Sequence, residues 1–307
     1  MSFDFQQVAA LWKAEKRRYV KPSSYSTYVT LINTRLLPFF GPGAPDEKKI
    51  QSFVDESLEA GASTKTVRDV LMVLKMILRY GAKIGAWQHP EYEIHFPSEM
   101  GRTRQVPVLT KSHQKRLIRY LEDNLTFRGL GILICLYSGL RIGELCGLQW
   151  RDLDLATNEI HVRKTVQRIW LNDGDDRYYS LVIGTPKTAN SRRDIPLAGE
   201  LVKLIRPLRR ITRDDHYVLT NTKEPIEPRY YRNWFSALLR ELGIPPTRFH
   251  SLRHTFATRC IESRCDYKTV SVILGHASIS TTLDLYVHPG YNEKQRCLEK
   301  MAKSIAE

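Results

Sequence analysis

The stretch HSLRHTFATRC, residues 250–260, combines a charged pair with an apolar face in one predicted helix. His250 and Arg253 are three residues apart and therefore project from one side of such a helix, while Leu252 and Phe256 supply the apolar face. Arginine is always charged and can hold two oxygens of a phosphate in a fork. The stretch therefore predicts a helix that packs on a core and directs cations at a phosphate.

Four further polar residues stand in unusual places outside this stretch. They are Arg141 in GLRIGEL, Lys187 in TPKT, and His276 and Tyr286 in LGHASISTTLDLY. Singly, each has an ordinary explanation: Arg141 could pair with Glu144, the lysine could lie in a turn, and the histidines could be structural. Together, two arginines can clamp a phosphoryl group that gains negative charge in its transition state. Such cations would favour the phenolate of Tyr286, whose ordinary pKa is about 10, and this predicts an activated nucleophile.

The composition bounds the class of protein. The 307 residues allow two domains, and a hydrophobic content of 42% is enough for packed cores. Lys and Arg number 47 against 33 Asp and Glu, which gives a formal charge of +14. Such a balance is typical of proteins that meet a polyanion such as nucleic acid, although a merely soluble basic protein can share it.

Cysteine usage and the first residues of the sequence indicate a compartment. The 5 cysteines include no C-x-x-C pair, and several lie in apolar runs, as expected of reduced thiols. The sequence begins without a cationic segment followed by an apolar one, and no apolar run approaches about eighteen residues. We therefore expect a cytoplasmic, nucleoid-associated protein that is neither secreted nor membrane-spanning.

The sequence lacks the common motifs of cofactor and metal sites. It contains no G-x-x-x-x-G-K-[ST] loop for a nucleotide, and no H-E-x-x-H motif or compact acidic cluster of the kind that holds magnesium in nucleases. We expect no cofactor and no metal ion, so side chains alone would carry out any phosphate chemistry.

Changes of pattern divide the chain into four parts. Residues 1–95 are predicted to form a helical bundle with basic faces, and residues 96–109, with two prolines, a glycine and two arginines, a linker. Residues 110–290 combine helical segments with β-like segments and are predicted to form an α+β domain. Residues 291–307 have apolar residues at helical spacing and predict an amphipathic tail helix.

The predicted helix over residues 63–85 separates apolar from basic positions. Its apolar residues recur at helical spacing behind a cap at Ser63 and Thr64, and its basic residues fall largely elsewhere. Each basic residue is as consistent with ordinary solvated charge as with a DNA contact. The candidate DNA contacts are Lys65, Arg68, Lys75 and Arg79 in this helix and Arg102 and Arg104 in the linker.

The ordered set R, K, H-x-x-R, H, Y closely resembles the tyrosine recombinase, or phage integrase, family. The local forms GLRIGEL, TPKT, HSLRHTFAT and LGHASISTTLDLY carry the resemblance, which spans about residues 110 to 290. It implies a mainly α fold with a small antiparallel β-sheet. In that fold a helical, SAM-like core-binding domain precedes an α+β catalytic domain.

The resemblance also implies a role for each residue of the set. Tyr286 would attack a scissile DNA phosphate to form a 3′-phosphotyrosyl bond, and Lys187 would protonate the leaving 5′-oxygen. Arg141 and Arg253 would clamp the non-bridging oxygens. The remaining roles are proton transfer at the tyrosine for His250, a hydrogen bond to the phosphate for His276, and orientation of neighbouring groups for Glu144.

The family resemblance implies partners as well as chemistry. The expected partner is double-stranded DNA with specific core sites, bound by a protein that is monomeric when free and tetrameric on two duplexes. An accessory directionality or DNA-bending protein could take part. The tail helix would dock on a neighbouring protomer, or else fold back on its own domain. The reaction would need neither metal nor ATP.

The sequence leaves open three alternatives to an integrase of a mobile element. The long insert RIWLNDGDDRYY, residues 168–179, favours an integrase of a phage or mobile element over a Xer recombinase that resolves chromosome or plasmid dimers. A type IB topoisomerase uses similar side chains but acts as a monomer. A non-catalytic DNA-binding relative would have lost the nucleophile, which is present here.

Overall fold

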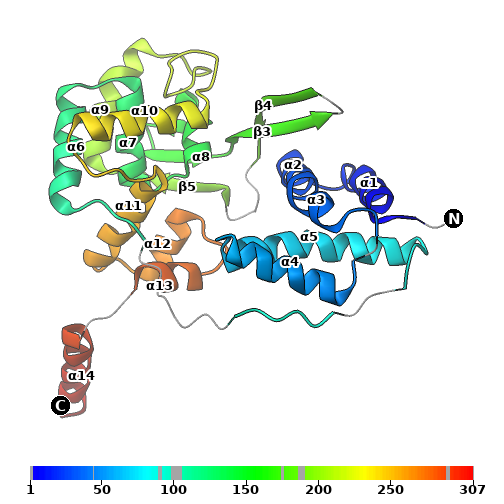
Figure 1. Ribbon diagram of the computed structural model, residues 1–307. Helices are drawn as coiled ribbons and strands as arrows, with labels where there is room; N and C mark the ends of the chain where they lie inside the picture. Colours follow the sequence, from blue (N-terminus) through cyan, green and yellow to red (C-terminus); the bar gives the residue numbers. More distant parts are fainter. Residues whose placement is uncertain are drawn as a thin grey trace. The chain divides into compact units, whose positions relative to one another are not determined.

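The computed structural model describes residues 3–43, 45–88, 92–97, 106–173, 176–185, 191–287 and 291–306. The chain divides into two compact units (Figure 1). Each unit has its own main cluster of buried hydrophobic residues. The first unit comprises Met1–Thr103 with Ile169–Ser180, and the second Arg104–Arg168 with Leu181–Glu307. Within the described ranges, no helix is long and apolar enough to cross a membrane.

The N-terminal part of the first unit, as far as Lys83, is built from helices, as the sequence predicts. A π-helical turn, η1, divides the helical stretch from Pro22 to Phe40 into three elements. Ser63 caps the last helix, because its side chain accepts a hydrogen bond from the backbone of Thr66 at 3.2 Å. The helices are α1 (Phe5–Lys16), α2 (Pro22–Leu31), η1 (Ile32–Leu36), α3 (Leu37–Phe40), α4 (Glu47–Glu59) and α5 (Thr64–Lys83).

The core of the first unit lies along one face of α5. Helices α1 and α4 both pack against α5. Aromatic rings from α1, α3 and α4 meet in this core, and Phe40 contacts Phe5 and Phe53 with ring centroids 5.9 and 5.5 Å apart. The apolar residues of α5 that the sequence places at helical spacing are all buried: Val67, Val70, Leu71, Leu74, Ile77 and Leu78.

The second unit surrounds a small antiparallel sheet with helices. Strands β1 (Leu153–Asp154), β2 (Glu159–Val162) and β5 (Arg193–Pro196) form the sheet in the order β1-β2-β5, with Ile160 opposite Ile195. Strands β3 (Thr165–Asp173) and β4 (Asp176–Gly184) form a separate two-stranded sheet, of which Ile169–Ser180 counts with the first unit. A mainly helical fold with a small antiparallel sheet confirms the fold class predicted from the sequence.

The helices and helical turns of the second unit follow the order of the chain. Before the sheet come α6 (Lys111–Asp123), α7 (Phe127–Ser138), α8 (Ile142–Cys146) and the 3-10 turn η2 (Trp150–Asp152). After it come α9 (Gly199–Leu208), η4 (Arg209–Ile211), α10 (Pro228–Glu241), α11 (His250–Glu262), α12 (Tyr267–Leu274), α13 (Ser280–Tyr286) and α14 (Tyr291–Ala306).

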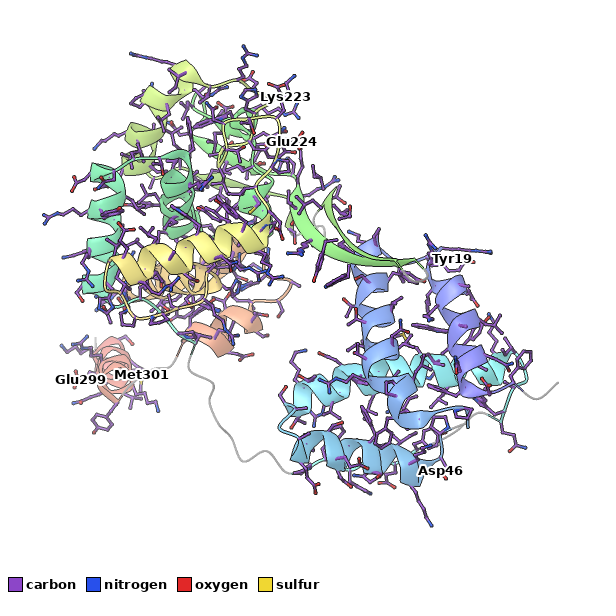
Figure 2. All side chains as sticks on the ribbon, turned by 45° about the horizontal axis from the view of Figure 1, so that its top comes forward. Tyr19, Asp46, Lys223, Glu224, Glu299 and Met301 are labelled. Atoms are coloured by element: carbon purple, nitrogen blue, oxygen red, sulfur yellow. The ribbon has the colours of Figure 1, made fainter. Side chains whose placement is uncertain are left out.

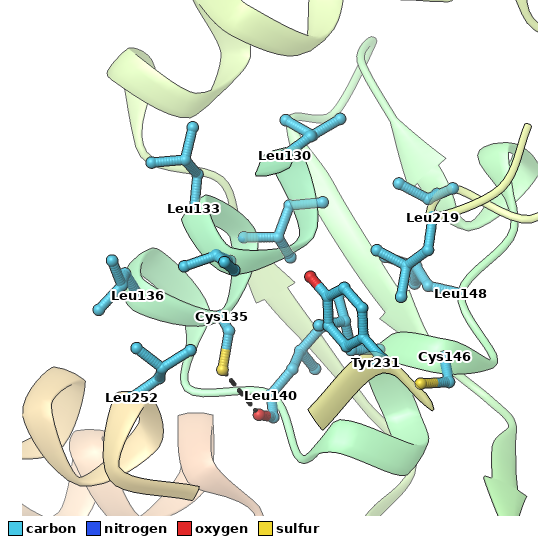
Figure 3. Packing of buried hydrophobic residues seen from close by; sticks show 14 of the residues in the cluster. Leu130, Leu133, Cys135, Leu136, Leu140, Cys146, Leu148, Leu219, Tyr231 and Leu252 are labelled. Atoms are coloured by element: carbon cyan, nitrogen blue, oxygen red, sulfur yellow. Dashed lines mark hydrogen bonds between the residues drawn. The ribbon is translucent and has the colours of Figure 1, made fainter. Parts of the chain in front are cut away.

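Helix α7 lies at the centre of the second core and ends in a tight turn (Figure 3). Gly139 ends the helix with φ of 65°, a left-handed conformation that favours glycine. A Cβ added there would lie 2.6 Å from Phe256 and 2.7 Å from Leu274, so only glycine fits. The Cys135 thiol donates to the carbonyl of Leu140 at 3.2 Å. This packed turn fixes the backbone immediately before Arg141.

Candidate active site

Arg253 lies at the centre of the candidate site and is only 1% exposed. Its guanidinium donates from Nη1 to the Gly139 carbonyl and from Nη2 to the Leu274 carbonyl, both at 2.8 Å. Burial and the nearby charge of Arg141 lower its pKa to about 9, so the group remains charged at neutral pH. The side chain thus joins the turn after α7 to the end of α12 and carries a buried positive charge.

Three consecutive carbonyl oxygens at the end of α12 each accept a hydrogen bond from a different arginine. The last carbonyls of a helix have no partner within it and carry a partial negative charge, so they attract cations. Three guanidinium groups from different elements therefore gather at one helix end. The bonds are Arg193 Nε to Ile273 (2.6 Å), Arg253 Nη2 to Leu274 (2.8 Å) and Arg141 Nη2 to Gly275 (2.9 Å).

Glu144 links two of these arginines from a buried position. Its carboxylate accepts from Arg141 Nη1 at 2.8 Å, and from both terminal nitrogens of Arg193 at 3.0 and 3.1 Å. Burial raises the pKa of Glu144, but the hydrogen bond and charge of Arg193, together with Arg141, outweigh it, so the pKa falls below its usual value. Glu144 is therefore an anion that fixes the orientation of Arg141.

Arg193 was not singled out as a candidate from the sequence. Its signal is the alternation in strand β5, where Arg193 and Ile195 are buried and Asp194 and Pro196 are exposed. A charge on the inward face of a strand is unusual and points to a buried partner. The partner here is Glu144.

Replacing Arg193 with alanine should lower the free energy of unfolding by about 3 kcal/mol, because it leaves a buried carboxylate with one cation instead of two. Urea denaturation of the two proteins measures the difference. Arg192→Ala is the matched control: Arg192 is the exposed neighbour, and its loss should change stability by less than about 0.5 kcal/mol. Equal losses for the two variants would contradict the assigned pairing.

Tyr286 lies at the end of α13 and is only 8% exposed. Its ring packs in a small cluster with Ala257, Val270 and Leu274. Its phenolic oxygen lies 2.7 Å from Nδ1 of His254. His254 was not recognised as a site residue from the sequence, although it directly follows Arg253 and lies one turn beyond His250.

A nearby cation lowers the pKa of Tyr286, as predicted, but the net shift of this pKa is upward, so the predicted activation of the nucleophile is not found in this structure. Burial of the phenol is the largest effect and raises the pKa, and the charge of Arg253 lowers it by less. Tyr286 is therefore a neutral phenol in the unliganded protein. An anionic nucleophile would require a group that removes the proton.

The two predicted site histidines border the arginine cluster. His250 begins α11 and is exposed, and its ring meets that of His254 edge-on at 4.6 Å between centroids. His276 follows Gly275, and its Nδ1 lies 2.8 Å from Thr282 Oγ1. Desolvation, followed by neighbouring positive charge, lowers the pKa of each to about 4, so both are neutral at physiological pH.

The predicted DNA contacts of α5 are all at the surface. Lys65, Arg68, Lys75 and Arg79 are exposed. Lys65 pairs with Asp69 at 2.7 Å, and the Arg68 guanidinium lies 4.8 Å from the ring centroid of Phe96. Three further predicted site residues lie outside the described residues: Lys187, Arg102 and Arg104.

An open groove of about 620 Å³ lies beside His250. Two exposed arginines, Arg232 and Arg248, line it together with His250. Ile142, the residue after Arg141, also lines it. The groove is therefore a basic surface close to the arginine cluster.

The sequence matches two models of known domains. Residues 107–293 match the model described as the phage integrase family, and residues 4–43 match the N-terminal SAM-like domain of phage integrases. The first match covers more than half of the chain. The chain belongs to the phage integrase family. It is therefore a tyrosine recombinase, an enzyme of the class that cleaves and rejoins DNA strands.

Three curated relatives show which members of the phage integrase family this chain resembles. The ICEBs1 integrase of Bacillus subtilis is 25% identical, and the alignment covers 98% of this chain and 83% of the relative. A XerC-like tyrosine recombinase of Caldanaerobacter subterraneus is 26% identical, with 82% and 70% covered. The transposase of Tn916 from Enterococcus faecalis is 27% identical, with 64% of this chain and 51% of the relative covered. The relatives named for mobile elements favour the predicted integrase type, and the Xer alternative is less specific.

Solved structures of integrases share the fold of this chain. The Tn1549 transposon integrase superposes with a TM-score of 0.76 at 22% identity, covering 98% of this chain and 100% of the other. Lambda integrase superposes with a TM-score of 0.63 at 14% identity, covering 90% and 93%. The helical domain followed by a catalytic domain, predicted from the sequence, is thus the fold of this chain.

Proposed function

We propose that this protein is a site-specific recombinase that cuts DNA by forming a 3′-phosphotyrosyl bond at Tyr286. The observation that carries the proposal is the single phenol held on α13, with its oxygen against His254, next to a helix end where three arginines meet. Attack by the phenol on a DNA phosphate would release a 5′-hydroxyl. That hydroxyl, or one from another strand, can reverse the step without ATP.

Arg141 and Arg253 would hold the phosphate during this step. The Arg141 side chain is 36% exposed, and an arginine has five N–H donors, so its bonds to Glu144 and Gly275 leave donors for a phosphate oxygen. Arg253 is buried, and its charge acts at low local dielectric, where it stabilises negative charge more strongly than at the surface. We assign Glu144 to the orientation of Arg141.

The other roles follow the family resemblance. Lys187 would protonate the leaving 5′-oxygen as general acid. His276 would donate a hydrogen bond to the phosphate, and His250 would assist proton transfer at Tyr286. Both are neutral imidazoles, which can accept as well as donate protons. The proposed domain limits are residues 1–95 for core binding, 96–109 for the linker, 110–290 for catalysis and 291–307 for the tail.

The proposed substrate is duplex DNA with specific core sites. Related integrases were solved with such partners: that of Tn1549 with circular-intermediate DNA, and that of lambda with a core site. The basic residues of α5 follow one another at intervals of 3, 7 and 4, which places them on one exposed face of the helix. DNA phosphates would be neutralised by this face of α5, by Arg102 and Arg104, and by the groove at Arg232 and Arg248.

The tail helix α14 supports a proposal about assembly. Its apolar stripe is uncovered: Leu298 is 63% exposed, Met301 48% and Ile305 75% (Met301 is labelled in Figure 2). A stripe of this kind needs a partner surface. We assign it to a neighbouring protomer in a tetramer on two duplexes. A protein lacking residues 291–307 should still shift one duplex in a gel but not join two.

The biological role we propose is integration or excision of a mobile element, acting on DNA in the cytoplasm with or without an accessory protein. The relatives from ICEBs1, Tn916 and Tn1549 support this role. Resolution of chromosome or plasmid dimers is the second candidate, favoured by the XerC-like relative.

The proposed chemistry can be tested on a nicked duplex selected from a randomised pool by its binding to the protein. Cleavage near the nick releases a short fragment and traps the covalent product. Because arginines stabilise the charge in this scheme, excess EDTA should leave the amount of SDS-resistant adduct unchanged within about twofold. Loss of the adduct on chelation and its return with magnesium would contradict the proposed mechanism.

A further inference from the structure

None of the roles assigned so far uses the hydrogen bond between His254 and Tyr286. His254 Nδ1 lies 2.7 Å from the phenolic oxygen. A general base must lie within hydrogen-bond distance of the atom whose proton it removes, and His254 does. Among the described residues, His254 is the hydrogen-bond partner of the Tyr286 oxygen. His250, which the resemblance associates with the tyrosine, contacts the ring of His254 instead.

We propose that His254 is the catalytic base that takes the proton of Tyr286, an inference that rests on the proposed recombinase function. As the phenolic oxygen bonds to phosphorus and the bond from phosphorus to the 5′-oxygen breaks, the phenolic proton moves to Nδ1 of His254. The 5′-oxygen takes a proton from the general acid. In the reverse step the imidazolium returns its proton to the phenolic oxygen as the 5′-hydroxyl attacks.

The surroundings of His254 suit it to this task. Tyr286 faces it from α13, and His250 and Arg253 flank it on α11. Partial burial, followed by the charge of Arg253, lowers the pKa of His254, so the ring is unprotonated at neutral pH and can accept. Tyr286 starts as a neutral phenol whose pKa burial has raised, and it therefore needs a base at the moment of attack.

The row of rings also offers the proton a route outward. The centroid of the His254 ring lies 5.6 Å from that of Tyr286 and 4.6 Å from that of His250. Tyr286 is buried, whereas His250 is exposed. A proton taken from the phenol by His254 is therefore close to a solvent-accessible imidazole.

The test compares single-turnover cleavage of the selected nicked duplex by the wild type, His254→Asn and His254→Gly. Asparagine keeps a hydrogen-bonding group near the Nδ1 position but cannot accept the proton, so it separates the base from a merely positioning side chain. We expect both variants to bind the duplex normally and to cleave about 10²- to 10³-fold more slowly. Imidazole added to His254→Gly should restore part of the rate.

The pH profile supplies a second readout that needs no variant. Because a base must be unprotonated, the wild-type rate should rise with pH and level off below the ordinary histidine value of about 6.5. His254→Asn should lack this rise, and His250→Asn should keep it.

Two results would overturn the assignment: a His254→Asn rate within threefold of wild type, or a wild-type rate independent of pH below 6.5. If the wild type itself forms no adduct, the proposed function fails rather than this inference alone. A variant that does not bind DNA leaves the wild-type profile as the deciding measurement.

Discussion

Tyr286→Phe should bind DNA as the wild type does and form no detectable covalent adduct. Only the phenolic oxygen is removed, and that oxygen is the proposed nucleophile. The ring would still pack with Ala257, Val270 and Leu274. The loss of one hydrogen bond to His254 should cost about 1 kcal/mol of stability. Denaturing gels of the trapped nicked duplex measure the adduct, and gel shifts measure binding.

Tyr291 provides the matched control. It is the next tyrosine along the chain, it is 79% exposed, and it begins α14. Tyr291→Phe should form adduct at the wild-type rate. An SDS-resistant adduct from Tyr286→Phe, or its loss from Tyr291→Phe alone, would move the nucleophile away from Tyr286.

Lys187→Ala should cleave an ordinary nicked duplex about 10²- to 10⁴-fold more slowly than the wild type, the range expected for loss of a general acid. A duplex with sulfur in place of the bridging 5′-oxygen has a better leaving group and needs no proton. That duplex should restore the rate of Lys187→Ala to within about tenfold of the wild type on the same substrate.

Arg141→Ala separates the two roles assigned around the phosphate. An arginine that stabilises the non-bridging oxygens is still needed when the leaving group is sulfur, so the modified duplex should rescue Arg141→Ala far less. Equal rescue of both variants, or rescue of neither, would assign the acid to another residue.

Local patterns in the sequence were sufficient to predict most helices of the fold. Six apolar residues of α5 recur at helical spacing behind Ser63, and both their burial and the cap are found in the structure. The break at η1 escaped prediction, because Ile32–Leu36 contains no proline or glycine to mark it. A π-helical turn of this kind depends on how the surrounding helices pack, which a single sequence does not reveal.

The site was predictable where residue type alone limits the chemistry. An arginine pair, two histidines and a tyrosine in order indicated phosphate chemistry, and the structure brings Arg141 and Arg253 to adjacent carbonyls of one helix end. Arg193 and His254 were missed because their importance lies in partners 49 and 32 residues away. The sign of the Tyr286 pKa shift was missed because burial, unlike charge, cannot be counted from the sequence.

The most direct test of the central claim is to locate the bond between protein and DNA. The trapped adduct can be digested with protease and nuclease, and the nucleotide-bearing peptide identified by mass spectrometry. The account predicts a single peptide in which Tyr286 is joined to the 3′-phosphate of the cleaved strand. A bond at any other residue, or to a 5′-phosphate, would contradict it.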